Sequence, residues 1–155
     1  MHKLSVLFFT VFLVACQTTH PDSVSAHAAN PSRDDLTEYA LSLQGTPYKY
    51  GGNSPDTGFD CSGFVGYVFK HSAGKSLPRS SAAISHIGAP EKASALKPGD
   101  LVFYNTLHKA YSHVGIYLGN RQFIHAPSSG KSVSIVNMDE EYWLKRYNGA
   151  RRLMP

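Results

Sequence analysis

Cys61, His113 and His125 have side-chain types that suit nucleophilic catalysis. A thiolate attacks carbonyl carbons, and a nearby imidazole can take the thiol proton and later return it to a leaving group. Cys61 follows Asp60, a residue type that caps helices, so the thiol is expected in the first turn of a helix. Unpaired N–H groups at a helix start are expected to lower the thiol pKa. The alternative is that Cys61 is a small buried apolar residue.

The two histidines fall in neighbouring predicted strands, and the turn between the strands decides whether their side chains meet. With a two-residue turn, His125 points away from His113, which is then an ordinary strand-end histidine. With a three-residue loop over residues 119–121, His125 lies opposite Gly115 on the face of His113. The Cβ atoms are then diagonal neighbours about 7–8 Å apart, close enough for the imidazoles to hydrogen-bond. Two-residue turns are common, so the pattern leaves both registers open, and catalysis requires the odd loop.

Helical patterns come first along the chain, and strand patterns follow. Ser32 can cap a first helix that ends before Gly45, and a loop is expected over 48–59. An antiparallel sheet of five to six strands with the N-terminal helices packed on it, an α+β domain, is therefore predicted. The other expected helices cover residues 61–71, 80–86 and 139–147. The expected strands are Leu101–Tyr104, Ser112–Leu118, Gln122–Ala126, Ser132–Val136 and Ala150–Leu153.

The N-terminus has the features of an export signal. Lys3 precedes an apolar run over residues 4–14 that is too short to span a bilayer as a stable helix. The run ends at Cys16, in a pattern that resembles a bacterial lipoprotein signal, with an ordinary secretory signal as the alternative. We therefore expect a signal peptide over 1–15, a lipidated flexible tether over 16–31 and a folded domain over 32–155.

Composition argues against several function classes. The formal net charge is +4, and no basic stripe is interleaved with aromatic residues, so nucleic acid is not an expected partner. The eight histidines are scattered and the two cysteines lack C-x-x-C spacing, so no metal site is expected. With Cys16 lipidated, Cys61 has no disulfide partner in the chain. An unpaired thiol in an exported protein is expected to be buried or used.

Six short motifs occur in an order that resembles the NlpC-type family of bacterial cell-wall cysteine peptidases, which has a reduced papain-like fold. The resemblance extends from about residue 34 to residue 153. Each motif alone is weak evidence, whereas six in order are specific. The motifs are Pro47–Gly52, Phe59–Val65, Leu77–Ser81, Pro98–Phe103, Ser112–Tyr117 and Phe123–Ala126.

The resemblance implies a role for each matching residue. Cys61 would be the nucleophile, His113 the general base, and His125 the third polar residue that orients the His113 ring. Tyr50 matches a family tyrosine whose hydroxyl lies near the oxyanion, with a plain loop aromatic as the alternative. Asp60, Ser62 and Arg79 also match motif positions. Helix capping and structural pairing explain these three residues as well as substrate contact does.

The implied function is a peptidoglycan endopeptidase that works through a thioester, without a metal or cofactor. The lipid on Cys16 would anchor it to a membrane, and Gln17 favours the periplasmic face of the outer membrane. An acyltransferase or amidase on the same scaffold and a non-catalytic peptidoglycan-binding lipoprotein are the alternatives. The sequence specifies neither the oligomeric state nor the bond, which in related enzymes is D-glutamyl–diamino acid or diamino acid–D-alanine.

Overall fold

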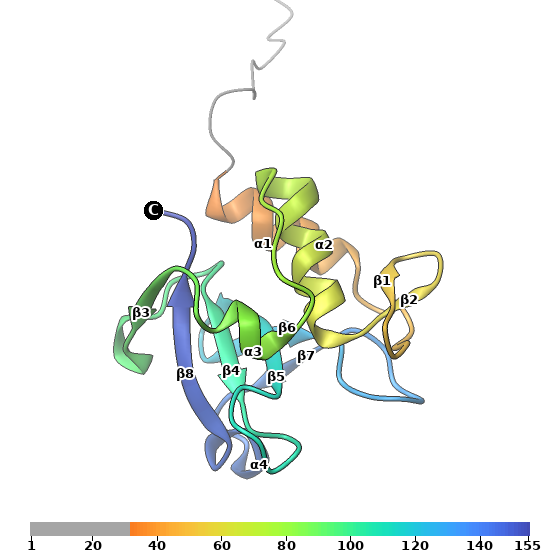
Figure 1. Cartoon of the computed structure of the whole chain (residues 1–155). Helices are drawn as coiled ribbons and strands as arrows, with labels where there is room; N and C mark the ends of the chain where they lie inside the picture. Colours follow the sequence, from red (N-terminus) through yellow and green to blue (C-terminus); the bar gives the residue numbers. More distant parts are fainter. Residues whose placement is uncertain (1–31) are drawn as a thin grey trace, which may run out of the picture.

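A computed structural model describes residues 32–155, so the expected signal peptide, the tether and Cys16 lie outside the described residues (Figure 1). Within 32–155, no helix is long and apolar enough to cross a membrane. The helices are α1 (Arg33–Ser42), α2 (Cys61–Ala73), α3 (Ser81–Ile84) and α4 (Glu141–Leu144), with a 3-10 turn at Ala93–Ala95. The strands are β1 (Asn53–Ser54), β2 (Gly58–Phe59), β3 (Ala89–Glu91), β4 (Leu101–Tyr104), β5 (His113–Gly119), β6 (Gln122–His125), β7 (Ser134–Asn137) and β8 (Tyr147–Arg152).

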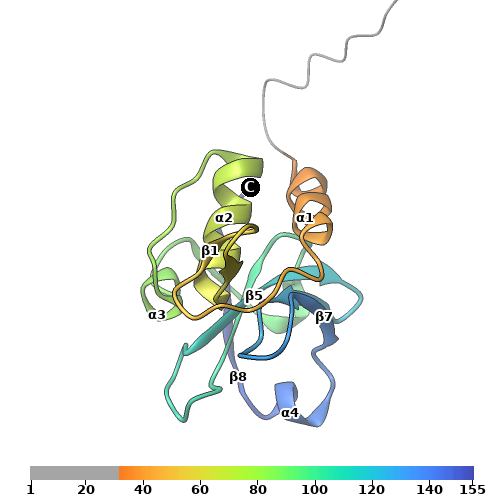
Figure 2. The same cartoon turned by 90° about the vertical axis from the view of Figure 1, so that its right-hand side faces the viewer.

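Six strands form the central sheet, in the order β3-β8-β4-β5-β6-β7, and every neighbouring pair is antiparallel. Helices α1 and α2 lie together on one side of this sheet (Figures 1 and 2). This arrangement confirms the predicted α+β fold with N-terminal helices on an antiparallel sheet. The edge strand β3 was not predicted, and the helix expected over 139–147 is only the single turn α4, because β8 already begins at Tyr147.

Alternate strand residues enter two separate apolar clusters, as the two-residue period of a strand requires. Val114 and Ile116 of β5 pack with α1 and α2 in the larger cluster. Tyr117 of β5 and Phe123 of β6 instead pack with Trp143 of α4 in a smaller cluster on the other face. The sheet is therefore buried on both faces, and α4 covers the face opposite the two long helices.

The start of α2 is fixed by its cap and by a close backbone contact. Asp60 is the N-cap, as predicted, and its side chain accepts a hydrogen bond from the Gly63 N–H. A Cβ atom on Gly63 would lie 2.0 Å from the Gly52 carbonyl oxygen, so only glycine allows the 48–59 segment to cross the first helical turn. That segment, predicted as a loop, contains the short hairpin β1–β2. The thiol-bearing residue is thus held at a defined helix start.

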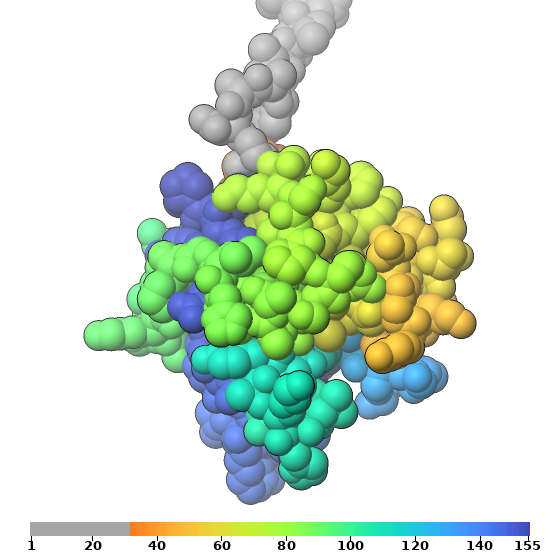
Figure 3. Space-filling model, viewed as in Figure 1, coloured from red at the N-terminus to blue at the C-terminus, as the bar shows by residue number. Residues whose placement is uncertain are grey.

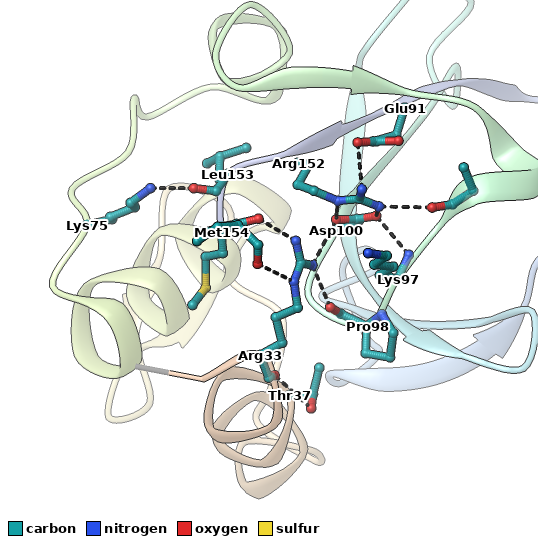
Figure 4. Close-up of polar contacts among 12 residues, drawn as sticks. Arg33, Thr37, Lys75, Glu91, Lys97, Pro98, Asp100, Arg152, Leu153 and Met154 are labelled. Carbon is teal, nitrogen blue, oxygen red and sulfur yellow. Dashed lines mark hydrogen bonds and ion pairs between the residues drawn. The ribbon is translucent and has the colours of Figure 1, made fainter. Parts of the chain in front are cut away.

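A buried carboxylate joins the two ends of the domain (Figure 4). Asp100, fully buried, accepts hydrogen bonds from Arg33 of α1 at 3.0 Å and from Arg152 of β8 at 2.6 and 2.9 Å. Arg33 also donates to the Pro98 and Met154 carbonyls, and Arg152 pairs with Glu91 of β3 at 2.8 Å. We call these residues around Asp100 the Asp100 cluster. It connects α1, the edge strand and the C-terminal strand.

Candidate active site

The register of β5 and β6 brings His113 and His125 together. Tyr117 lies opposite Phe123, so the same register places His125 opposite Gly115, on the face of His113. The ring nitrogens His113 Nε2 and His125 Nδ1 are 2.6 Å apart, which is a hydrogen-bonding distance. The predicted pairing of the two side chains is therefore confirmed.

The odd register does not come from the predicted three-residue loop. Gly119 pairs with Gln122, so the turn itself is the two residues Asn120 and Arg121, with φ of 49° and 60°. The pairing shifts by one residue between Tyr117 and Gly119, which is a β-bulge. A bulge adds one residue to one strand, so it changes which face the following side chains occupy. The two-residue turn and the one-residue bulge together place His125 on the face of His113, as the predicted three-residue loop would have done.

The hydrogen bond between the rings constrains the tautomer of His113. With Nε2 engaged by His125, Nδ1 is the ring nitrogen that remains to accept a proton. A neutral imidazole that accepts at Nδ1 carries its own proton on Nε2. In that state His113 Nε2–H donates to His125 Nδ1, and His125 fixes the orientation of the ring.

Trp143 covers the histidine pair and was missed by the sequence analysis. Its ring stacks on His113, with centroids 5.7 Å apart at 30°, and meets His125 at 4.9 Å and 89°. Phe123 lies beside His125, with centroids 5.1 Å apart, because Gly115 has no Cβ atom that would clash with its ring. His113 and His125 are only 4% and 1% exposed as a result. Aromatic rings therefore shield most of the surface of the pair.

Burial makes both rings neutral at physiological pH. Burial lowers the pKa of His113 to about 4. The pKa of His125 is lowered further, first by burial and then by the positive charges of His113 and Lys131. Burial disfavours the charged form of an imidazole, so both directions have the same physical cause. A neutral His113 is a proton acceptor.

Cys61 is the first residue of α2, and its thiol lies against the start of β5. Backbone N–H groups of Val114, Ser62 and Cys61 itself contact the sulfur and lower the thiol pKa. Burial and the Asp60 carboxylate raise that pKa by more, so the net pKa of Cys61 is raised. The expectation of a lowered thiol pKa is therefore wrong, because desolvation outweighs the helix-start N–H groups. Since Val114 follows His113 directly, the thiol contacts the backbone of the residue next to His113.

Asp60, Ser62 and Arg79 form one hydrogen-bonded network below the thiol. Asp60 Oδ1 accepts from the Gly63 N–H at 2.7 Å and from the Ser62 hydroxyl at 3.0 Å. The Arg79 guanidinium donates to both Asp60 oxygens, at 3.0 and 2.9 Å. Burial raises the pKa of Asp60, but the Arg79, Gly63 and Ser62 hydrogen bonds outweigh it and the net pKa is lowered. These residues hold the cap of α2 and also line the pocket beside Cys61.

Two tyrosines of one motif occupy different environments near the thiol. Tyr50, the predicted oxyanion residue, is 86% exposed at the rim of the Cys61 pocket. Tyr48 is half-buried, and its N–H donates to the Lys131 carbonyl at 2.8 Å. Burial and then the negative charge of a Cys61 thiolate raise the pKa of Tyr48, so its hydroxyl lies within electrostatic range of the sulfur. Sequence analysis missed Tyr48, although it stands in the same motif.

Two pockets flank the thiol and the histidine pair, and Leu107 lines both. The one that contains Cys61, here the Cys pocket, has a volume of about 610 Å³. The one that contains His113 and His125, here the His pocket, has a volume of about 470 Å³. Figure 3 shows the segment around Leu107 (teal) on the surface between the green residues near α3 and the blue residues near α4. Cys61 therefore lines one pocket, and the histidine pair lines the other.

Comparisons with known proteins agree with this geometry. The family model described as NlpC/P60 family matches residues 45–152. Murein DD-endopeptidase MepH of Escherichia coli K12 is 45% identical over 71% of this chain and 42% of its own length. Murein DD-endopeptidase MepS/Murein LD-carboxypeptidase of the same strain is 45% identical over 77% of this chain and 61% of its own length.

The fold also matches solved structures. A crystal structure of an NlpC/P60 family protein from Bacillus cereus superposes with a TM-score of 0.76 at 35% identity, covering 82% of this chain and 42% of that one. The chain thus spans less than two thirds of the length of these relatives. The match over residues 45–152 includes Cys61, His113 and His125 with their supporting elements. The chain belongs to the NlpC/P60 family.

Proposed function

We propose that this chain is a cysteine peptidase that hydrolyses peptide bonds in peptidoglycan, with Cys61 as nucleophile and His113 as general base. The observation that carries the proposal is the 2.6 Å contact between His113 Nε2 and His125 Nδ1, together with a thiol at a helix start that contacts the N–H of Val114, the residue after His113. A nucleophile, a base and a third group that orients the base are the parts that acyl transfer requires. The names of the MepH and MepS relatives support peptidoglycan as the substrate.

The proposed reaction starts from a neutral thiol and a neutral imidazole. The Cys61 proton moves to His113 Nδ1 as the sulfur attacks the peptide carbonyl carbon, and a tetrahedral oxyanion forms. The imidazolium then protonates the leaving nitrogen, the C–N bond breaks and a thioester remains. Water attacks the thioester while His113 takes its proton, which releases the carboxylic acid and restores the thiol. His125 accepts from His113 Nε2–H throughout.

The oxyanion needs hydrogen-bond donors at the start of α2. The Cys61 backbone N–H is one such donor because the first N–H groups of a helix have no partner within the helix. We assign the second to the Tyr48 hydroxyl, since Tyr48 is half-buried near the sulfur while Tyr50 is 86% exposed. Loss of one such donor raises a barrier by about 3 kcal/mol in comparable enzymes.

The proposed membrane attachment rests on the sequence around Cys16. Lipid on Cys16 would hold the enzyme at a membrane surface, and the residues up to 31 would allow it to reach the cell wall. Gln17 favours the outer membrane in this proposal. Cys16→Ser is expected to release the protein into the soluble fraction with its activity intact. A Cys16→Ser protein that still sediments with membranes would contradict the lipid assignment.

Digestion of purified peptidoglycan tests the proposed reaction. The wild-type protein is expected to release fragments with new free amine and carboxyl ends, identified by mass spectrometry, and Cys61→Ala none. The fragments also identify the bond that is cut. Fragments in which the acyl group has moved to an added amine instead of to water would show an acyltransferase. Equal cleavage by wild type and Cys61→Ala would exclude the cysteine mechanism.

A further inference from the structure

The proposed mechanism places a positive charge on His113, and no carboxylate among residues 32–155 forms an ion pair with it. Burial alone lowers the pKa of His113, and the positive charge of Lys131, between β6 and β7, further disfavours a charged His125. Glu140 lines the His pocket but shifts the pKa of neither histidine. Asp60, at the start of α2, acts on the thiol instead. The side chains that stabilise the imidazolium are therefore uncharged.

A large aromatic face lies over His113. The Trp143 ring stacks on the imidazole, with ring centroids 5.7 Å apart and planes at 30°. The face of an aromatic ring is electron-rich, so it attracts a cation within about 6 Å of its centre, and tryptophan does so most strongly. His125 instead meets the Trp143 ring at 89°, with centroids 4.9 Å apart. The imidazole stacked on Trp143 is thus the one that receives the thiol proton.

The smaller apolar cluster holds the Trp143 ring in place. Tyr104 of β4 and Phe123 of β6 meet the ring at 68° and 89°, with centroids 5.0 and 5.1 Å away. The Trp143 N–H donates to the Glu140 carbonyl at 2.9 Å. Trp143 is 8% exposed and His113 is 4% exposed, so solvent reaches little of either ring. The attraction between a cation and a ring face is stronger where water is excluded.

We propose that Trp143 is a positioning residue whose ring face stabilises the imidazolium that forms on His113 during the reaction. The inference rests on the proposed peptidase function. The covalent steps are unchanged: the proton moves from the thiol to His113 Nδ1 and then to the leaving nitrogen, and Trp143 exchanges no atoms or electrons. Attack by the thiol and attack by water both form this imidazolium, so either rate-limiting step depends on it. The contact is expected to raise kcat about tenfold.

Fluorination of the ring tests this electrostatic role without changing the packing. Trp143 is the single tryptophan of the sequence, so fluorinated tryptophan changes this residue alone. Fluorine withdraws electron density from the ring face and weakens its attraction for a cation, while the ring keeps nearly the same shape. The full chain, purified in detergent, is prepared with one, two and three fluorines on the indole. For soluble peptidoglycan fragments, kcat is expected to fall with each fluorine, to about a tenth with three, at little changed KM.

Trp143→Phe, produced with the same fluorinated tryptophans, is the matched control because it contains no tryptophan. Its kcat is expected to be lower than that of the wild type and independent of the tryptophan supplied. Urea unfolding is measured in parallel, so that rates are compared per folded molecule. A wild-type kcat that stays constant as fluorines are added would overturn the inference, because a ring that only shields the histidines does not depend on its charge distribution. An equal fall in Trp143→Phe would also overturn it, since the effect would then lie outside residue 143.

Alkylation of Cys61 by iodoacetamide tests the same charge separation without peptidoglycan. The sulfur forms a bond to carbon, iodide leaves and the thiol proton moves to His113. The rate at neutral pH, followed by mass spectrometry of the peptide that contains Cys61, is expected to fall with each fluorine as kcat does. A falling alkylation rate in a protein that cleaves no peptidoglycan would support the role of Trp143 and contradict the peptidase. Cleavage and alkylation that are both insensitive to fluorine would contradict the role of Trp143 and leave the peptidase in place.

Discussion

The domain contains two buried polar clusters that differ in how charge is balanced. Asp100 is fully buried, yet two arginines donate to both of its oxygens, and its pKa is lowered despite the burial that raises it. His113 and His125 are buried to a similar degree, but their partners are each other and aromatic rings. The two arginines therefore keep Asp100 charged despite its burial, whereas burial keeps the two imidazoles uncharged.

This difference separates a structural role from a chemical one. The arginines favour the ionised form of Asp100, so its carboxylate does not titrate near neutral pH. The Asp100 cluster therefore holds α1, β3 and β8 together as a structural element. An imidazole without a charged partner in an apolar site is a neutral base, and His113 has one ring nitrogen outside its hydrogen bond with His125. Mutations that remove one member of each cluster should consequently affect different observables, stability for the first and turnover for the second.

The largest expected effect separates the two histidines by role. His113→Asn should lower peptidoglycan cleavage by at least about 10³-fold, because an amide cannot take the thiol proton at neutral pH. His125→Asn should retain measurable activity, because its amide oxygen can still accept from His113 Nε2–H. Both are measured as initial rates on purified sacculi at equal folded concentration. An active His113→Asn protein beside an inactive His125→Asn protein would reverse the assigned roles.

The Asp100 cluster should show the opposite pattern. Asp100→Asn leaves Arg33 and Arg152, whose side chains are 17% and 18% exposed, without their buried counter-charge. Removal of one partner from such a network is expected to lower the free energy of unfolding by about 3 kcal/mol, with activity per folded molecule unchanged. Urea unfolding measures the first quantity, and the sacculus assay the second.

Asp139→Asn is the matched control for that stability prediction. Asp139 pairs with Arg121 at 2.7 Å, but both side chains are exposed, at 55% and 38%. Solvent screens such pairs, so the urea midpoint of Asp139→Asn should match that of the wild type. If Asp139→Asn were destabilised as much as Asp100→Asn, burial would not be the property that distinguishes the two carboxylates.

The two tyrosines of the Pro47–Gly52 motif give a smaller and purely kinetic test. Tyr48→Phe is expected to lower kcat about 100-fold with little change in KM, because an oxyanion donor acts in the transition state. Tyr50→Phe should change kcat by less than about threefold, since Tyr50 is 86% exposed. An equal fall in kcat for both variants, or a larger fall for Tyr50→Phe, would contradict the assignment of the oxyanion donor to Tyr48 alone and would favour Tyr50.

Sequence patterns predicted those parts of the fold and site that local chemistry determines. The cap at Asp60 follows from residue type and the alternation in β5 from apolar spacing, and both are confirmed. The resemblance to known motifs pointed to Cys61, His113 and His125, and parity showed which register catalysis requires, while the strand pattern left both registers open. Each of these depends on neighbours within a few residues or on one hairpin.

Sequence patterns did not predict the contacts between segments that are distant along the chain. Trp143 covers His113 from 30 residues away in sequence, and nothing in the 139–147 segment indicates that contact. Arg33 and Arg152 meet Asp100 from opposite ends of the domain for the same reason. The thiol pKa was predicted in the wrong direction because the helix start is visible in the sequence, whereas the burial of Cys61 appears only after folding.

The pH dependence of stability distinguishes the two clusters within one protein. The pKa of His113 falls from 6.5 in the unfolded chain to about 4 in the fold, and that of His125 is also lowered. Between those values the unfolded chain binds more protons, so stability present above pH 6.5 is lost as pH falls toward 4. Each group contributes a slope of at most about 1.4 kcal/mol per pH unit.

Asp100 also has a lowered pKa, but from an unfolded value of 3.8, so its contribution to stability is lost only at lower pH. Urea unfolding at pH steps from 8 to 3 should therefore show two limbs. His113→Asn should flatten the limb between pH 6.5 and 4, and Asp100→Asn the limb below pH 4. If His113→Asn left the upper limb unchanged, the pKa of His113 would be the same in the folded and the unfolded protein. Burial would then not be the property that keeps this imidazole neutral, and the contrast with Asp100 would fail.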